Sequence, residues 1–175
     1  LGTPPRRIPA IERMEETIAR LELEHAGVIK TGRTHLQDAV PIAFSQEMSG
    51  WRAMLRACRH MLRDSLPGLY ALALGGTAVG TGLNAPEGFD DAVAAQVAEL
   101  TGLPFVTAGN KFHALSSKDA VVFAHGALKA LAADLMKIAN DVRWLASGPR
   151  CGLGEITIPE NEPGSSLTPG KGNPT

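Results

Sequence analysis

We predict an all-α fold in which long helices form a bundle, and three observations on the 175-residue sequence support this. Alanine and leucine are abundant while aromatic residues make up 5% of the chain, which favours helix over sheet. Apolar residues recur at alternating steps of three and four near residues 10–28 and 41–66. The period-two alternation typical of strands is weak, and residues 155–160 are the one short candidate.

Two apolar stripes predict the first two helices. Residues 1–9 are a proline-rich lead-in segment, and the helix over 10–28 carries the stripe Ile11, Met14, Ile18, Leu21, His25 and Val28. We expect residues 30–41 to be mostly loop, because Gly32 permits unusual backbone angles and Pro41 suits the first turn of a new helix. The helix over 41–66 has the stripe Phe44, Met48, Trp51, Leu55, Cys58 and Leu62, with arginines 52, 56, 59 and 63 on its other side.

Glycine-rich sequence separates these helices from a longer one. The stretch 66–89 begins as a short helix and breaks at Gly75 and Gly76, and a further short helix covers 89–100. Residues 111–146 contain no proline and predict a single helix of roughly 50 Å. It is apolar around most of its circumference, so we expect it to be buried in a bundle shared between subunits.

Composition and charge exclude several classes of protein. The formal net charge of −1 gives no electrostatic basis for binding nucleic acid or an anionic membrane surface. No run of 18 apolar residues is present, so we expect no membrane span. Two cysteines and five scattered histidines argue against a disulfide framework and against a metal site, and they favour a reducing compartment.

Three loops concentrate polar side chains: Arg33 to Asp38, Asn110 to His113, and Ser165 to Asn173. The last of these is rich in glycine, and its backbone N–H groups suit an oxyanion. A lysine close to a serine hydroxyl stabilises the alkoxide and makes it a usable base. On the residues alone, ordinary turn chemistry is the commoner reason for a serine pair in such a loop. From the residues alone, the prediction is an all-α oligomer with polar loops suited to a small anion.

Several blocks in sequence order resemble the fumarase/aspartase superfamily, from about residue 9 to residue 175. The stretch "GSSLTPGKGNPT" is similar to the signature loop of that superfamily, and "KTGRTHLQDAVP" is similar to a second characteristic region. "ALGGTAVGTGLN" and "KIANDVRWLASGPRCGLGEI" also resemble it. Thr34-His35, "NKF" and "IPENEPGSS" resemble class II fumarases more than aspartases.

The resemblance implies a reaction and a set of roles. The reaction is the reversible hydration of fumarate to (S)-malate, an anti addition without a cofactor or a metal, through an aci-carboxylate intermediate. Ser165 would be the base, and His35 would hold the water that leaves or attacks. Substrate binding falls to Thr34, Lys171, Asn173, Asn110 and Lys111, and Glu162 would orient the loop. The signature departs from its usual form at Thr168 and Gly172, where methionine and valine are expected, and this affects the stability of the loop.

The resemblance also implies an organisation. Residues 10–175 would be part of a central helical domain that ends in the signature loop at 159–175, with the N-terminal and C-terminal domains of the family absent from this chain. The expected assembly is a homotetramer acting on a small dicarboxylate, in the cytoplasm or, in a eukaryote, in the mitochondrial matrix. Two alternatives stay open: an ammonia-lyase reaction on aspartate, and a non-catalytic oligomerisation core.

Overall fold

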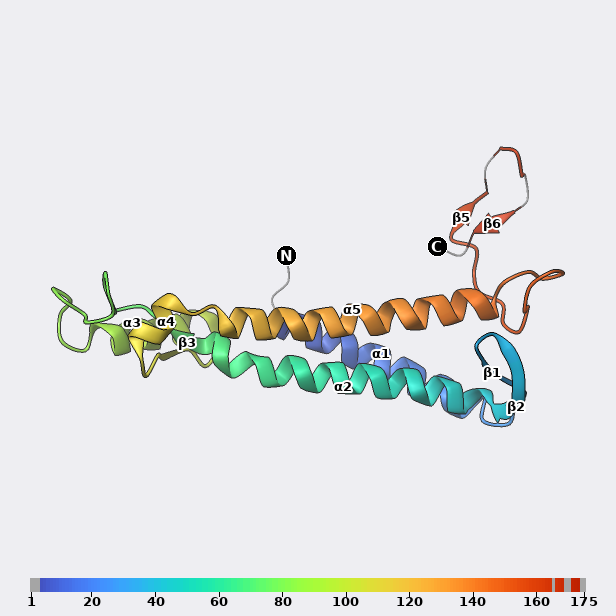
Figure 1. Cartoon of the computed structure of the whole chain (residues 1–175), viewed down its shortest axis with the longest axis horizontal. Coiled ribbons are helices and arrows are strands. Elements are labelled where there is room, and N and C mark those ends of the chain that lie inside the picture. The colour runs from blue at the N-terminus through green and yellow to red at the C-terminus, as the bar shows by residue number, and fades with distance from the viewer. Residues whose placement is uncertain (1–3, 165, 169–170, 174–175) are drawn as a thin grey trace. The chain divides into compact units, whose positions relative to one another are not determined.

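The computed structural model describes residues 4–164, 166–168 and 171–173, and helices dominate it (Figure 1), in agreement with the predicted all-α fold. The chain divides into two compact units, one ending at Leu131 and one beginning at Ala132. Helix α5 (Asp119–Leu145) contributes to both units. Strands in the described part of the chain form three two-stranded ladders.

An antiparallel pair of long helices forms the core of the first unit. Helix α1 (Pro4–Glu24) packs along helix α2 (Phe44–Tyr70). Helix α1 begins before residue 10, so residues 4–9 of the expected lead-in are helical. All six apolar residues predicted for the stripe of α2 are buried: Phe44, Met48, Trp51, Leu55, Cys58 and Leu62. The predicted stripe is confirmed, because residues at this regular spacing all lie on one face of the helix.

The arginines of α2 bind acidic residues of α1 in reverse order along the chain. Arg52 pairs with Glu22, Arg59 with Glu15 and Glu12, and Arg63 with Glu12. As the numbers rise on one helix they fall on the other, which is the register of an antiparallel pair. The ion pairs flank the buried stripe, so the two helices are matched by charge as well as by apolar packing.

A hairpin joins α1 to α2, and the prediction of a loop over 30–41 is wrong. Strand β1 (Ile29–Thr34) pairs in antiparallel fashion with strand β2 (Gln37–Ala43). At the other end of α2, strand β3 (Ala71–Leu72) lies parallel to strand β4 (Val106–Thr107). Helix α3 (Phe89–Thr101) lies between these strands in sequence, close to its predicted bounds.

The predicted single helix over 111–146 is wrong, because it breaks into helix α4 (Lys111–Ser116) and α5. Ser117 has an extended backbone, and its hydroxyl accepts a hydrogen bond from the Asp119 N–H at 3.2 Å, which starts α5. In the second unit, the Glu155 N–H donates to the Leu145 carbonyl at 2.8 Å and closes the end of α5. Residues 155–160 form no strand; strands β5 (Glu162–Pro163) and β6 (Gly172–Asn173) follow instead.

Candidate functional site

Thr34 and His35 lie at the tip of the β1–β2 hairpin. Thr34 is the last residue of β1 and pairs with Gln37, so His35 and Leu36 form a two-residue turn. Their φ angles are 52° and 60°, both in the left-handed region. Turns of this kind match the twist of the strands, but they usually contain glycine or asparagine. A histidine held in a sparsely populated backbone conformation is a feature of functional sites.

Ionic contacts attach the hairpin to the first turns of α2. The Lys30 ammonium lies 2.6 Å from the Glu47 carboxylate, both being largely buried, and 5.9 Å from the centre of the Phe44 ring. The Phe44 N–H donates to the Val28 carbonyl at 2.9 Å. The hairpin therefore has a defined base, from which its tip carries Thr34 and His35.

Asn110 caps helix α4. Its side-chain oxygen accepts a hydrogen bond from the His113 N–H at 2.9 Å, the usual contact of an N-cap residue. The structure thus gives Asn110 a role in the fold, and its contact with substrate stays a prediction.

Lys111 lies at the junction of β3, β4 and α3. Its ammonium donates to the Thr107 hydroxyl and to the Ala108 carbonyl at 3.2 Å, and lies 3.3 Å from the Asp90 carboxylate. The hydrogen bond from Thr107 and the neighbouring ammonium lower the pKa of Asp90. The lysine side chain is only 11% exposed. A substrate contact by Lys111 would require these bonds to be exchanged.

The signature loop is closed by the β5–β6 ladder. Glu162 pairs with Asn173, and the Gly164 N–H donates to the Lys171 carbonyl at 2.6 Å. Three predicted residues, Glu162, Lys171 and Asn173, therefore lie at the base of one short loop. Ser165, the predicted base, lies outside the described residues. A Cβ at Gly172 would collide with the Glu160 side chain, so a valine there needs Glu160 to rotate away.

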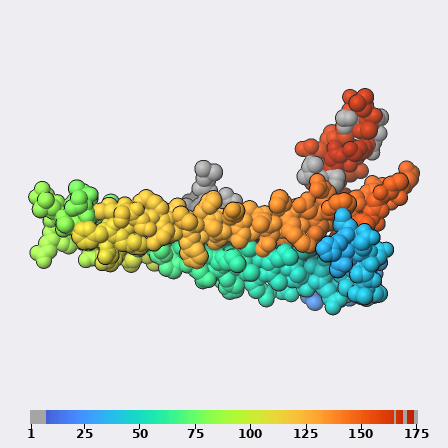
Figure 2. All heavy atoms as spheres, viewed as in Figure 1, coloured from blue at the N-terminus to red at the C-terminus, as the bar shows by residue number. Residues whose placement is uncertain are grey.

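The first unit holds its predicted site residues at opposite ends of α2. The hairpin with His35 precedes Phe44, whereas Asn110 lines a cleft together with Gly68 and Leu69 of the last turns. A helix of 27 residues is about 40 Å long. In Figure 2 the blue hairpin and the green loops near residue 80 lie at the two ends of this helix. These side chains cannot meet one small substrate within a single chain.

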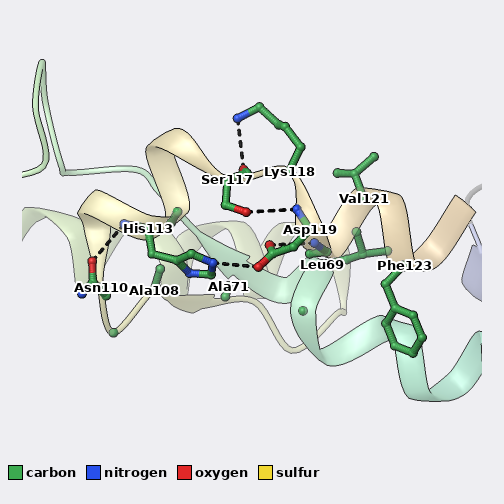
Figure 3. Close-up of a pocket in the computed structure, with 14 residues that line it drawn as sticks. Leu69, Ala71, Ala108, Asn110, His113, Ser117, Lys118, Asp119, Val121 and Phe123 are labelled. Carbon is green, nitrogen blue, oxygen red and sulfur yellow. Dashed lines mark hydrogen bonds and ion pairs between the residues drawn. The ribbon is translucent and has the colours of Figure 1, made fainter.

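A cleft of about 610 Å³ opens beside Asn110, where α2 ends and α5 begins. Leu69, Val121 and Phe123 contribute its apolar lining (Figure 3). The His113 Nε2 lies 2.8 Å from the Asp119 carboxylate and bridges the break between α4 and α5. This hydrogen bond lowers the pKa of Asp119.

Sequence reasoning did not anticipate the pair of His113 and Asp119, since it placed both residues on one continuous helix. The run Ser117-Lys118-Asp119 before an apolar stretch was the available signal, because serine and aspartate favour helix starts.

The described residues contain neither a metal-binding cluster nor a membrane-spanning helix. Among residues 4–164, 166–168 and 171–173, no three His, Cys, Asp or Glu side chains gather closely enough to hold a metal ion. In the described part of the chain, no helix combines the length and the apolar character needed to cross a bilayer.

Comparison with known families decides where this arrangement belongs. The family model described as Lyase matches residues 6–175, nearly the whole chain. The chain belongs to this lyase family. The matched residues include both the hairpin with His35 and the loop with Lys171.

Several proteins similar to this chain carry names more specific than that of the family. The class II fumarate hydratase of Ralstonia nicotianae is 61% identical over 96% of the chain, and that of Staphylococcus saprophyticus is 61% identical over 95%. The crystal structure of class II fumarase from Schistosoma mansoni superposes with a TM-score of 0.92 at 41% identity, over 95% of this chain and 38% of that one. These matches confirm the predicted resemblance and the helical fold. The chain spans 36% of the length of both curated relatives.

Proposed function

We propose that the parent protein of this chain catalyses the reversible hydration of fumarate to (S)-malate, as a carbon–oxygen lyase. The observation that carries the proposal is the 61% identity, over 96% of the chain, to a protein named class II fumarate hydratase. Thr34-His35 and the loop ending at Asn173 both lie within the matched stretch.

The proposed chemistry is an anti elimination and its reverse. Ser165, as its alkoxide, removes the proton from C3 of malate, and the electron pair passes into the adjacent carboxylate to give an aci-carboxylate. The electron pair then returns to form the C2–C3 double bond of fumarate, while the C2 hydroxyl takes a proton from a protonated His35 and leaves as water, which His35 holds. Lys171 and Asn173 stabilise the charge that grows on the carboxylate. Thr34 binds the substrate beside His35, and Glu162 orients the loop; no cofactor takes part.

We propose that complete sites form between subunits of a homotetramer. The separation of about 40 Å between the two ends of α2 supports this, because one dicarboxylate cannot span it. Apolar side chains of α5 also support it, since Val122 and Met136 are 67% and 64% exposed in the single chain. Because the chain spans 36% of the length of its relative and would lack part of the site, these 175 residues alone are proposed to act as an oligomerisation core with little or no turnover. The proposed compartment is the cytoplasm, or the mitochondrial matrix in a eukaryote.

The test uses the purified parent enzyme as an intact tetramer. Malate is added and the appearance of fumarate is followed by its ultraviolet absorbance; steady turnover is the expected result. Aspartate is supplied in a parallel sample, and ammonia is measured there. Release of ammonia without dehydration of malate would replace the proposed function by an ammonia-lyase reaction, and an intact tetramer inactive on both would refute both.

A further inference from the structure

We propose that Asp38 and Arg33 are positioning residues that hold His35 in its working orientation, an inference that rests on the proposed function. Arg33 and Asp38 face each other across the hairpin, one pair below Thr34 and Gln37. The Arg33 Nε donates to the Asp38 carboxylate at 3.2 Å. The ion pair therefore links the two strands directly below the turn that carries His35.

The turn needs a cross-strand link of this kind, because its backbone conformation is unfavourable for the residues it contains. Both His35 and Leu36 have φ in the left-handed region, where a Cβ crowds the following carbonyl. Local preference would return both residues to negative φ and reorient the imidazole. Contacts outside the turn must therefore maintain it, and the Arg33–Asp38 pair is the nearest side-chain bridge described across the strands.

The strands below the Arg33–Asp38 pair also favour the observed conformation of the turn. The register shifts between Thr31 and Arg33, leaving Gly32 as an irregularity that increases local twist. A Cβ at Gly32 would lie 2.8 Å from the Val40 carbonyl, so the strands approach closely here. The Arg33 side chain is 21% exposed and the Asp38 side chain is 79% exposed, so the guanidinium packs against the hairpin while the carboxylate reaches it from the solvent side. The bulge and the ion pair together fix the orientation of the turn that carries His35.

The first experiment measures turnover and KM of the full-length parent enzyme carrying Asp38→Ala. A displacement of about 1 Å can cost roughly a hundredfold in rate, so we expect kcat to fall at least tenfold while KM changes less. Asp38→Glu, which keeps the carboxylate, should restore much of kcat. The matched control is Glu24→Ala, which removes an exposed carboxylate from Arg20 at 2.7 Å on α1. If Asp38→Ala and Glu24→Ala behave alike, the inference is wrong.

The second experiment tests the backbone through Leu36. Leu36→Gly accepts a positive φ and should retain kcat, whereas Leu36→Pro fixes φ near −65° and should abolish it. Equal activity of the two variants would overturn the inference. If wild type shows no hydratase activity, the proposed function fails by itself. The inference is then judged by NMR of the His35 ring, whose resonances Asp38→Ala should shift and Glu24→Ala should not; Asp38→Asn replaces Asp38→Ala should the latter fail to fold.

Discussion

Arg59 of α2 donates two hydrogen bonds to the Glu15 carboxylate of α1, from Nε at 2.7 Å and from Nη2 at 3.2 Å. Glu15 is 8% exposed, and its hydrogen bond raises the pKa of the Arg59 guanidinium. A bidentate pair of this kind combines charge with fixed geometry. It lies midway along the helix pair whose loop carries His35, so it links the register of α1 and α2 to the position of the hairpin.

Removal of the Glu15 carboxylate should therefore destabilise the fold. We expect Glu15→Ala to lower the free energy of unfolding by about 2 kcal/mol, less than for a fully buried pair because Glu12 remains near Arg59. Urea denaturation of the chain measures the change. Glu24→Ala, which breaks an exposed pair, should cost no more than about 0.5 kcal/mol. Equal losses would mean that burial of the Glu15–Arg59 pair contributes nothing.

Lys111 offers a test between a structural and a substrate-binding role. Lys111→Met removes donors to Thr107 and the Ala108 carbonyl, and should lower the free energy of unfolding by about 2 kcal/mol. The exposed Lys118 gives the matched control, Lys118→Met. A raised KM for malate in the parent enzyme, with stability unchanged, would instead favour the role predicted from the sequence.

Asp90 should make stability sensitive to acid. Its pKa is lowered below the ordinary 3.8, first by the hydrogen bond from Thr107. A carboxyl group whose pKa is lower when folded stabilises the protein above its unfolded pKa, and this contribution disappears as pH falls through the folded value. Asp90→Asn should thus be less stable than wild type at neutral pH, and the two should converge as the pH falls through the lowered pKa of Asp90. Thermal melts across pH measure this, with Asp91→Asn as control; a gap that does not close in acid would contradict it.

How far the sequence predicts this structure depends on where each signal lies. The α2 stripe from Phe44 to Leu62 is unbroken, so periodicity alone predicts its burial. The hairpin was missed because His35 and Leu36 occupy a turn that glycine and asparagine usually mark. The break at Ser117 was missed because serine and lysine do not stop a helix by themselves; a new helix starts there because the Ser117 hydroxyl accepts a hydrogen bond from the Asp119 N–H. Tertiary contacts such as those of Lys111 leave no pattern in sequence.

The same limit applies to the candidate site. Motif resemblance singled out Thr34, His35, Lys171 and Asn173, because family blocks keep their residue types and order. It could not reveal that Asn110 caps a helix, since an N-cap and a ligand-binding asparagine look alike in sequence. Nor could it reveal the pair of Arg33 and Asp38, which depends on strand register.

Ser165→Ala tests the proposed base in the full-length enzyme. Loss of a general base typically costs roughly 10²- to 10⁴-fold in rate, so kcat should fall by that order while the tetramer persists. Steady-state assays of malate dehydration measure the rate, and light scattering measures the mass of the assembly. The neighbouring Ser166→Ala is the matched control and should retain far more activity. Wild-type turnover by Ser165→Ala would remove this serine from the mechanism.

Val122 and Met136 test whether the exposed side of α5 joins subunits. Both side chains are more than half exposed in the single chain, and an aspartate there would have to be desolvated at an interface. We expect Val122→Asp and Met136→Asp each to shift the full-length enzyme from tetramer to smaller species in light scattering, with turnover lost in parallel. Met136→Leu keeps the apolar surface and should assemble normally, because volume-conserving apolar exchanges are well tolerated. Tetramers of full activity in both aspartate variants would exclude this surface of α5 from the interface, and the sites would then have to be joined through another face.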